Sequence, residues 1–368
     1  MSFSTQFDPN EMAYWQDRSA SYQSDDVKRA IFATGTDLAR FSMLISPAAQ
    51  GHLETMAQRA HQLTVQRFGK VMQLFIPMYL SNECSNNCTY CGFSVANKFP
   101  RRTLNADEIR AEGILLASKG FRHLLLLTGE AQRKVGTEYI ANAVQILAPY
   151  FSSIGIEVQP MEEIDYHHLI GAGTDSLTVY QETYHPDSYS KYHLSGKKKE
   201  FGYRLDTPDR GGKAGFPKMN IGALLGLYDW RYEALSIASH LMYLNRHYWK
   251  SKLGISFPRI TKVFQDFSPK YLISDAEVTQ FILAFRLMFP DIGISLSTRE
   301  RAEFRDHLLP LGITQMSAES MTSPGGYSGF DEEAQFETTD HRPLATIQSH
   351  LTAVGYEPVF KDWDATLR

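Results

Sequence analysis

The sequence predicts an α/β protein, a (β/α)8 barrel with an N-terminal helical extension. Two observations predict this fold: short apolar runs recur along the chain, and most of them are separated by longer stretches of helical character. Near-continuous apolar strands separated by helices indicate a parallel sheet that is covered on both faces. An open, doubly wound sheet predicts much the same pattern. The runs are VMQLFIPMYLS (71–81), HLLLLTG (123–129), IGIEVQP (154–160), SLTVYQE (176–182), MNIGALLG (219–226), LGISFPR (253–259), IGISLST (292–298) and ITQMSAES (313–320).

A third observation favours the barrel. Polar residues collect where the predicted strands end, and the active sites of such barrels lie at the carboxyl ends of the strands. These polar residues are Ser81-Asn82, Thr128-Gly129-Glu130, Gln159, Gln181-Glu182, Arg259, Thr298-Arg299-Glu300 and Ser317.

The order of these patterns along the chain predicts three parts. Residues 1–69 are polar with helical patches, and we expect them to form the helical extension. In its last patch, apolar residues recur at helical spacing at positions 53, 56, 57, 60 and 63. We expect the barrel to occupy residues 70–320 and the C-terminal segment, residues 321–368, to pack on it.

Composition excludes several classes of function. The 368 residues carry a formal net charge of −4, which gives no electrostatic footprint for nucleic acid. No apolar run reaches the ~18–20 residues needed to span a bilayer. The first residues, MSFSTQFDPN, do not resemble a secretory signal. We therefore expect a cytoplasmic protein without nucleic-acid or membrane partners.

All three cysteines, Cys84, Cys88 and Cys91, fall in NECSNNCTYCGFS (82–94). An odd, clustered set argues against disulfides. Closed zinc sites and conventional iron–sulfur clusters need four protein ligands. A cubane held by three thiolates leaves one iron open, and an open position is where a substrate or cofactor binds. The alternatives are a zinc site that borrows a His or Asp ligand, and three unrelated buried thiols.

The C-x3-C-x2-C spacing, with Tyr90 before the last cysteine, resembles the signature of the radical S-adenosylmethionine (SAM) enzymes. The resemblance implies a [4Fe–4S] cluster whose open iron chelates the amino and carboxylate groups of SAM. Electron transfer from the cluster then yields methionine and a 5′-deoxyadenosyl radical.

A closer resemblance covers the chain from about residue 46 to the C-terminus. PMYLSNECSNNCTYCGFS, LLLLTGEAQRKVG, VYQETYH, RLDTPDRGGKAG, IGALLGLYDWR, SPGGY and the closing KDWD are similar to the 2-iminoacetate synthases, the tyrosine lyases of thiamine thiazole biosynthesis. This implies cleavage of the Cα–Cβ bond of L-tyrosine to 2-iminoacetate and p-cresol. It also implies a thiazole synthase partner and a reduced flavodoxin- or ferredoxin-type electron donor.

Three other functions are alternatives to tyrosine cleavage. The relatives that mature [FeFe]-hydrogenase carry a second cluster with its own C-terminal cysteines, but no cysteine follows Cys91 here, so that reaction is not expected. Radical SAM lyases of tryptophan are the close competitor. From a different class, the cysteines could belong to a non-catalytic iron–sulfur or zinc scaffold, which would not cleave SAM under reduction.

The resemblance assigns SAM contacts to strand-end residues, each with a structural alternative. Glu130, in TGE, would contact the methionine amino group, or simply stand at a helix N-terminus. Lys198 or Arg204 would pair with the methionine carboxylate, although Lys198 also fits a solvated lysine cluster. Ribose hydroxyls are assigned to Gln181 and Glu182, and the adenine to the close backbone approach at Gly222 and Gly226.

The substrate contacts follow in the same way. The guanidinium of Arg299 offers a rigid fork for the carboxylate of an amino acid, and Ser317 would add a hydrogen bond. Tyr90 would flank the adenine or the substrate. The alternative for Arg299 is a structural Arg–Glu pair at the rim of the barrel.

Overall fold

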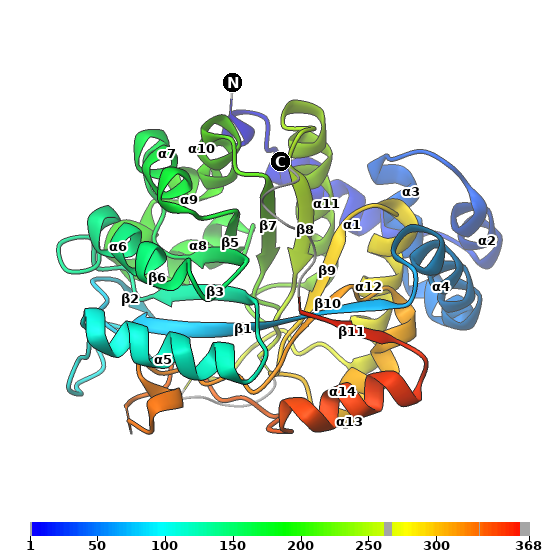
Figure 1. Cartoon of the computed structure of the whole chain (residues 1–368). Helices are drawn as coiled ribbons and strands as arrows, with labels where there is room; N and C mark the ends of the chain where they lie inside the picture. Colours follow the sequence, from blue (N-terminus) through cyan, green and yellow to red (C-terminus); the bar gives the residue numbers. More distant parts are fainter. Residues whose placement is uncertain (1, 261–266, 331, 361–368) are drawn as a thin grey trace.

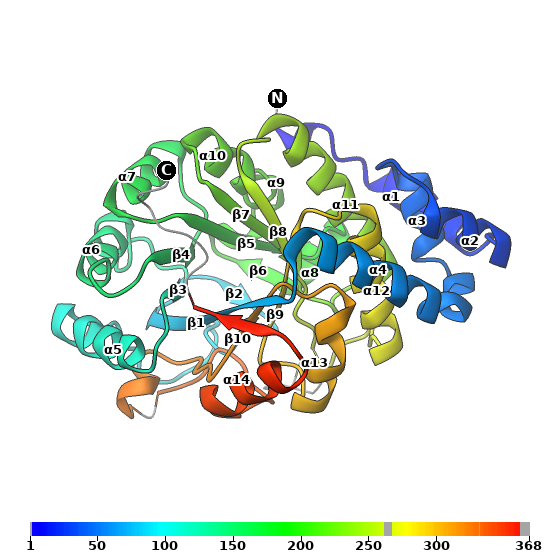
Figure 2. The same ribbon diagram turned by 45° about the vertical axis from the view of Figure 1, so that its right-hand side comes forward.

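The computed structural model describes residues 2–260, 267–330 and 332–360, so the KDWD stretch (361–364) lies outside the described residues. Within them, eight parallel strands close into a barrel, which confirms the predicted fold class (Figures 1 and 2). In order around the barrel these strands are β1 (Val71–Ser81), β3 (His123–Thr128), β4 (Ser153–Glu157), β5 (Ser176–Glu182), β7 (Lys218–Ala223), β8 (Lys252–Ser256), β9 (Gly293–Leu296) and β10 (Gln315–Ser317).

The pairing of the first and last barrel strands decides between a barrel and an open sheet. β10 pairs with β9 on one side and with β1 on the other, where Phe75 lies opposite Ser317. An open doubly wound sheet has two free edges, which this pairing removes. All eight strands therefore end at one mouth, as the polar strand ends predict.

Helices cover the outside of the barrel (Figure 2). Two of the stretches between predicted strands, 105–120 and 275–290, contain α5 and α12, and each helix begins with a side-chain N-cap, Asn105 and Ser274. The helices from the barrel region onward are α5 (Ala106–Ser118), α6 (Thr137–Leu147), α7 (Glu163–Ala172), α8 (Pro186–Tyr192), α9 (Phe201–Leu205), α10 (Thr207–Ala214), α11 (Trp230–His247), α12 (Asp275–Met288), α13 (Ala302–Leu308) and α14 (Leu344–Ala353).

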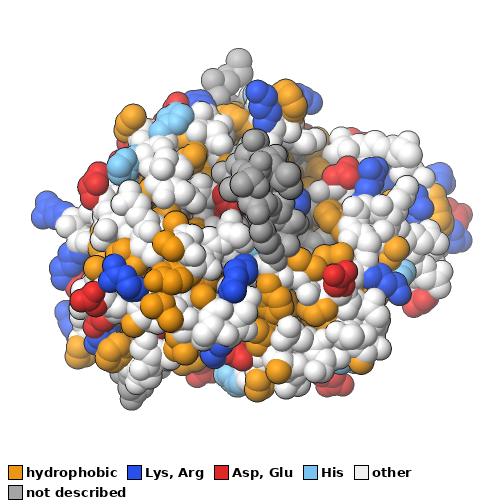
Figure 3. All heavy atoms as spheres, viewed as in Figure 1, with side chains coloured by type: hydrophobic (Ala, Val, Ile, Leu, Met, Phe, Trp, Pro, Cys, Tyr) orange, Lys and Arg blue, Asp and Glu red, His pale blue; other side chains and the backbone are white. Residues whose placement is uncertain are grey.

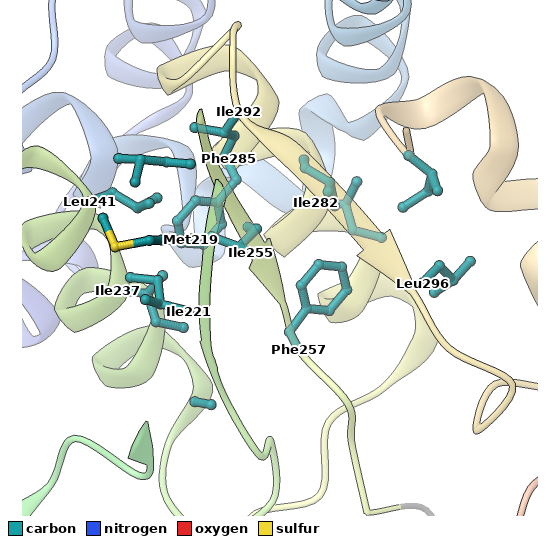
Figure 4. Close-up of a cluster of buried hydrophobic side chains, with 14 of the residues drawn as sticks. Met219, Ile221, Ile237, Leu241, Ile255, Phe257, Ile282, Phe285, Ile292 and Leu296 are labelled. Carbon is teal, nitrogen blue, oxygen red and sulfur yellow. The ribbon is translucent and has the colours of Figure 1, made fainter. Parts of the chain in front are cut away.

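The hydrophobic core lies between the strands and this helical layer. Figure 4 shows side chains of β7, β8 and β9 meeting those of α11 and α12, all of them buried. Burial on this scale is the dominant stabilising contribution to the barrel and fixes which strand faces point outward. The labelled residues of this layer include Met219, Ile221, Ile237, Leu241, Ile255, Ile282, Phe285 and Leu296.

The predicted N-terminal extension is helical and packs against the outer helices. Its helices are α1 (Pro9–Ser19), α2 (Ser24–Phe32), α3 (Leu38–Leu44) and α4 (Leu53–Phe68). In α4, Met56 and Ala60 are fully buried. The Phe3 ring stacks on His240 of α11, with the ring centroids 4.0 Å apart. The chain divisions at residues 69 and 320 stay predictions.

The C-terminal segment packs on the barrel. Residues 335–339 cross the mouth, where the amide of Gly92 donates to the carbonyl of Gln335 at 3.0 Å and that of Thr339 to the carbonyl of Thr298 at 2.8 Å. After α14 the chain forms β11 (Glu357–Val359), which pairs with β1 and adds a strand that the sequence pattern did not predict.

Two small features complete the fold. A two-stranded antiparallel pair, β2 (Asn87–Cys88) and β6 (His193–Ser195), joins the cysteine segment to the segment after β5. Among the described residues, no helix combines the length and apolar character needed to cross a bilayer. On the face shown in Figure 3, basic and acidic side chains are interspersed.

Gly222 is required by the packing of two strands. A Cβ added there would lie 1.8 Å from the carbonyl oxygen of Ser256 on β8. We expect Gly222→Ala to lower the free energy of unfolding by about 1–3 kcal/mol, as overpacking does. Gly171→Ala is the control, because an added Cβ in α7 meets no described atom within 4 Å. It should stabilise by up to about 1 kcal/mol. Urea denaturation measures both, and equal stabilities for the two variants would contradict this packing.

Candidate active site

A cavity of about 170 Å³ opens at the carboxyl ends of the barrel strands. Strand residues form its floor, and the segments that follow the strands form its mouth. The sequence-predicted residues that line it are Tyr90, Cys91, Glu182, Lys198, Arg299 and Ser317. Residues from distant parts of the sequence are thus brought together where the strand ends predicted a site.

The cysteine segment follows β1 and is folded around Arg101. Its guanidinium donates to the carbonyls of Asn82 at 2.7 Å, Phe93 at 2.8 Å and Ser94 at 2.7 Å. These bonds join the two ends of the segment, and charge-assisted bonds to carbonyls are among the stronger ones in proteins. Sequence analysis missed Arg101, because nothing in RRT (101–103) indicates that its side chain turns back onto the preceding loop.

The three thiols are free and lie in or beside the mouth of the cavity. Burial raises the pKa of each, that of Cys91 to about 11, while the nearby Lys198 ammonium lowers all three. Among the described residues, no three His, Cys, Asp or Glu side chains are grouped to hold a single metal ion. A cubane binds each thiolate to a different iron atom, so its ligands stand further apart than those of one zinc ion. The three free thiols beside a cationic side chain therefore fit an iron–sulfur cluster.

Next to the cysteines, four predicted residues form a buried charge cluster. Arg204 lies 2.8 Å from Glu130 and 3.6 Å from Glu182, and Lys198 lies 2.6 Å from Glu182. Burial alone would raise the pKa of both carboxyl groups, but the two cations outweigh it and hold both values below their usual range. Both carboxylates are therefore ionised at neutral pH.

The positions of Glu130 and Lys198 differ from those that their structural alternatives require. Glu130 lies in a loop, well before α6 begins at Thr137, so it is not a helix N-terminal residue. Lys197 and Lys199 are exposed, whereas Lys198 turns inward. Of the two candidates for the SAM carboxylate, Lys198 lines the cavity, and Arg204 stands behind it.

The Glu182 side chain points into the mouth of the cavity because β5 ends irregularly. The pairing of β5 with β7 shifts register between Tyr180 and Glu182, and the φ of Glu182 is 70°. A left-handed conformation is uncommon for a residue with a side chain and marks a strained position. Because a register shift re-aims the side chains that follow it, Glu182 reaches Lys198.

Asn86 connects the cysteine segment to the charge cluster. Its side-chain amide donates to Glu130 at 2.8 Å, and its oxygen accepts the backbone amide of Lys198 at 3.0 Å. The side chain is buried and its contacts hold both partners at fixed distance from the cysteines. An asparagine between two cysteines is a weak signal, since turns favour this residue.

Arg299 has no charged partner among the described residues. Its guanidinium lies 3.3 Å from the centre of the Phe336 ring, and burial lowers its pKa. The structural Arg–Glu pair at the rim is formed instead by Arg259, which donates twice to Glu300 at 2.7 and 2.6 Å. Arg299 is therefore a cation held in the cavity by an aromatic face, with its hydrogen-bonding fork available to a ligand.

Ser317 and Tyr90 both line the cavity. The Ser317 hydroxyl accepts the backbone amide of Thr298 at 3.2 Å, which places it beside Arg299. The Tyr90 hydroxyl bonds the Nε2 of His193 at 2.8 Å, and its ring lies 5.9 Å from the Lys198 ammonium. Both positions agree with the predicted contacts, whose roles stay predictions.

The residues predicted to bind the ribose and the adenine, other than Glu182, do not line the cavity. The Gln181 amide points to the carbonyl of Phe201 at 3.4 Å. Gly222 is already explained by its approach to Ser256, and Gly226 by a left-handed turn with φ of 116°. Ribose and adenine binding by these residues therefore stays a prediction.

Several residues of the cavity were missed by sequence analysis. Glu157 ends β4 and faces the cavity, while Gln335 and Phe336 come from the C-terminal segment. The Tyr79 hydroxyl donates to the Gln335 amide oxygen at 2.7 Å, so the segment is tied to the wall of β1. Glu157 carried a usable signal, since it is a carboxylate inside an apolar strand, but residues beyond 320 carried none.

Comparison with known proteins agrees with this site. Residues 78–236 match the radical SAM superfamily, and residues 256–357 match the biotin and thiamin synthesis associated domain. A crystal structure of HydG, a maturase of the [FeFe]-hydrogenase, superimposes with a TM-score of 0.91 at 28% identity, covering 96% of this chain and 80% of that one. Methylornithine synthase (PylB) shares the fold, with a TM-score of 0.71 at 21% identity over 91% of this chain and 97% of that one.

The sequence relatives carry a more specific description. The 2-iminoacetate synthase of Escherichia coli (strain K12) is 46% identical over 344 residues, which cover 93% of this chain and 91% of that protein. Identity at this level over nearly the whole length of both proteins shows the family. The chain therefore belongs to the 2-iminoacetate synthase family of the radical SAM superfamily.

Proposed function

We propose that this protein is a carbon–carbon lyase that cleaves L-tyrosine between Cα and Cβ, giving 2-iminoacetate for the thiazole of thiamine and releasing p-cresol. The observation that carries the proposal is the position of Arg299. Its guanidinium lies in the same cavity as Cys91 and Lys198 and has no charged partner among the described residues. A site of this kind suits a small molecule with a carboxylate, placed next to the cysteine segment.

Cys84, Cys88 and Cys91 would hold a [4Fe–4S] cluster with one iron left for SAM. When bound, the cluster and SAM supply a one-electron reductive cleavage that makes a hydrogen-abstracting radical. The chain's contribution is to hold the cysteine segment rigid. Arg101 and Asn86 do so through their bonds to its backbone and to Glu130.

The charge cluster would hold the amino-acid end of SAM. Glu130 would accept from its ammonium group, and Lys198, which lines the cavity, is better placed than Arg204 to meet its carboxylate. The four side chains neutralise one another without ligand, so a zwitterion can exchange partners with them at no net cost in charge. Arg204 then keeps Glu130 ionised and oriented.

Arg299 and Ser317 would hold the substrate carboxylate. The rest of the cavity keeps water from the reacting atoms: the Phe336 ring covers the guanidinium, and the tie between Tyr79 and Gln335 closes the wall beside it. A fixed carboxylate places the amino group of the substrate at one end of the cavity, next to Cys91 and Lys198. Hydrogen abstraction depends on this placement.

The product and the cofactor both imply partner proteins. 2-Iminoacetate hydrolyses readily, so we propose direct transfer to a thiazole synthase. The cluster needs an electron for each turnover, for which we propose a reduced flavodoxin or ferredoxin in the cytoplasm.

The cluster ligands are tested by replacing each cysteine in turn. Cys84→Ala, Cys88→Ala and Cys91→Ala should each lose the cluster and SAM cleavage, because three ligands leave no redundancy. Iron and sulfide analysis after anaerobic reconstitution measures the first effect, and 5′-deoxyadenosine the second. Stoichiometric zinc without iron in the anaerobically prepared wild-type protein would contradict the assignment.

Substrate identity is tested by product analysis. L-Tyrosine should raise the yield of 5′-deoxyadenosine and release p-cresol. Phenylalanine should give far less cleavage product, because it lacks the phenol that stabilises the departing benzylic fragment. Chromatography of anaerobic reactions measures each product. A reaction with tryptophan and none with tyrosine would assign the chain to the tryptophan lyases instead.

Arg299→Lys separates a substrate clamp from a structural side chain. It keeps the charge but loses the two-pronged contact, at a cost of about 2–4 kcal/mol in substrate positioning, or roughly 30- to 1000-fold in turnover. The cluster should still form, and uncoupled SAM cleavage should rise relative to p-cresol.

The matched control is Arg301→Lys. Arg301 is exposed and pairs with Asp275 outside the cavity, so the ratio of p-cresol to 5′-deoxyadenosine should not change. If Arg299→Lys were fully active on tyrosine, the carboxylate would be held elsewhere. If it lacked the cluster, Arg299 would be structural.

A further inference from the structure

The cavity has two levels with different chemistry. Its mouth is built by segments that follow the strands, and Arg299 stands there, the third residue after β9 ends at Leu296. Its floor is built by residues inside the strands. These are largely apolar or aromatic, and include Phe75, Pro77, Leu125, Leu127, Glu157, Tyr180, Ser256 and Ser295.

Two carboxylates stand among the strand residues that line the cavity, and their surroundings differ. Glu182 is paired with Lys198 and Arg204. The side chain of Glu157 makes no hydrogen bond or ion pair with any described residue, although it lines the cavity. It is the last residue of β4 and lies opposite Leu127 in the strand pairing. A carboxylate that faces an apolar cavity without a partner is costly to keep, so a ligand is its natural partner.

The position of Glu157 relative to Arg299 follows from the order of the strands. Around the closed barrel, β4 and β9 are four strands apart in a ring of eight, so the two residues stand on opposite walls. Arg299 is higher, beyond its strand, and Glu157 is lower, within its strand. An amino acid whose carboxylate is held at Arg299 therefore extends its side chain across the floor toward Glu157.

We infer that Glu157 accepts a hydrogen bond from the phenol hydroxyl of the substrate and so selects tyrosine over phenylalanine. The inference rests on the proposed function and names a specificity residue for it. A buried phenol needs a partner for its hydroxyl, while its ring suits the walls formed by Phe75, Leu125 and Leu127. A site built to bond a hydroxyl rejects the analogue that lacks it, because its own polar group is then left unpaired.

The electrostatics of the floor agree with a ligand that donates a hydrogen bond. Burial and then the neighbouring Glu182 raise the pKa of Glu157 to about 7, and Arg299 opposes them. A hydrogen-bond donor would lower that pKa by satisfying the charged form. The competing assignment is that Glu157 holds the amino group of the substrate, and the two assignments differ in which ligands they affect.

Equilibrium binding to the reconstituted holoenzyme with SAM tests the inference without turnover. The ligands are L-tyrosine, L-phenylalanine and 3-(4-hydroxyphenyl)propionate, which keeps the phenol and lacks the amino group. Glu157→Met keeps the size and removes the acceptor. This variant should lower the affinity for tyrosine and for the propionate by roughly ten-fold or more, and should change the affinity for phenylalanine by less than about two-fold.

A second variant and a control complete the design. Glu157→Gln replaces a charged acceptor by a neutral one, so the affinity for tyrosine should fall several-fold and the affinity for phenylalanine should not change. This variant provides the test if Glu157→Met does not fold. Glu337→Met alters an exposed carboxylate at the mouth of the same cavity and should leave the preference for tyrosine over phenylalanine unchanged.

Two results would overturn the inference. Equal weakening of tyrosine and phenylalanine, with the propionate unaffected, would assign Glu157 to the amino group. Unchanged affinities for all three ligands would remove it from recognition altogether. Either result leaves tyrosine cleavage by the wild-type enzyme intact, whereas failure of the wild type to cleave tyrosine would reject the proposed function itself.

Discussion

The pairing of β1 with β10 is the constraint on which the site depends. This pairing closes the ring, so the eight strand ends surround a single mouth and β4 lies opposite β9. In an open sheet, the same two strands would be separated along the sheet and would not face each other. The cysteine segment follows β1. Ser317 ends β10, which pairs with β1, and Arg299 follows β9, the next strand around the ring. Closure thus brings the cluster ligands and the proposed carboxylate site to the same rim, although more than 200 residues separate them in sequence.

Within that rim, electrostatics are arranged around buried ions. Two acidic and two basic side chains, Glu130, Glu182, Lys198 and Arg204, satisfy one another at hydrogen-bonding distance or close to it. Such clusters add little to stability compared with apolar packing, since desolvation offsets most of the attraction. Their presence, together with the left-handed backbone of Glu182, is therefore better explained by ligand binding than by folding. Arg299 differs from this cluster: it is a half-buried cation beside an aromatic ring, and it forms no ion pair with a described residue.

The mouth is completed by the C-terminal segment, which ties together elements that the barrel alone would leave apart. Gln335 contacts both the cysteine segment and Tyr79 of β1, while Thr339 is bonded to the segment after β9. Beneath this segment, Arg305 and Asp340 form a fully buried ion pair, and the Arg305 guanidinium also donates to the carbonyl of Ser317 at 2.5 Å. This bond fixes the backbone of Ser317, which is a proposed substrate contact.

The sequence by itself determined the barrel strands, the helices between them and the three cysteines, while its resemblance to a known family named the residues of the charge cluster. It could do so because apolar periodicity and residue spacing are local properties of the chain. Only the tertiary structure decided which of the predicted contacts reach the cavity: Glu182 and Lys198 line it, while Gln181 and Gly222 do not. It also decided that Arg259 takes Glu300 and leaves Arg299 without a partner, and that Glu157 and Gln335 join the site. Those outcomes depend on a register shift, on ring closure and on contacts between distant segments, which no local pattern encodes.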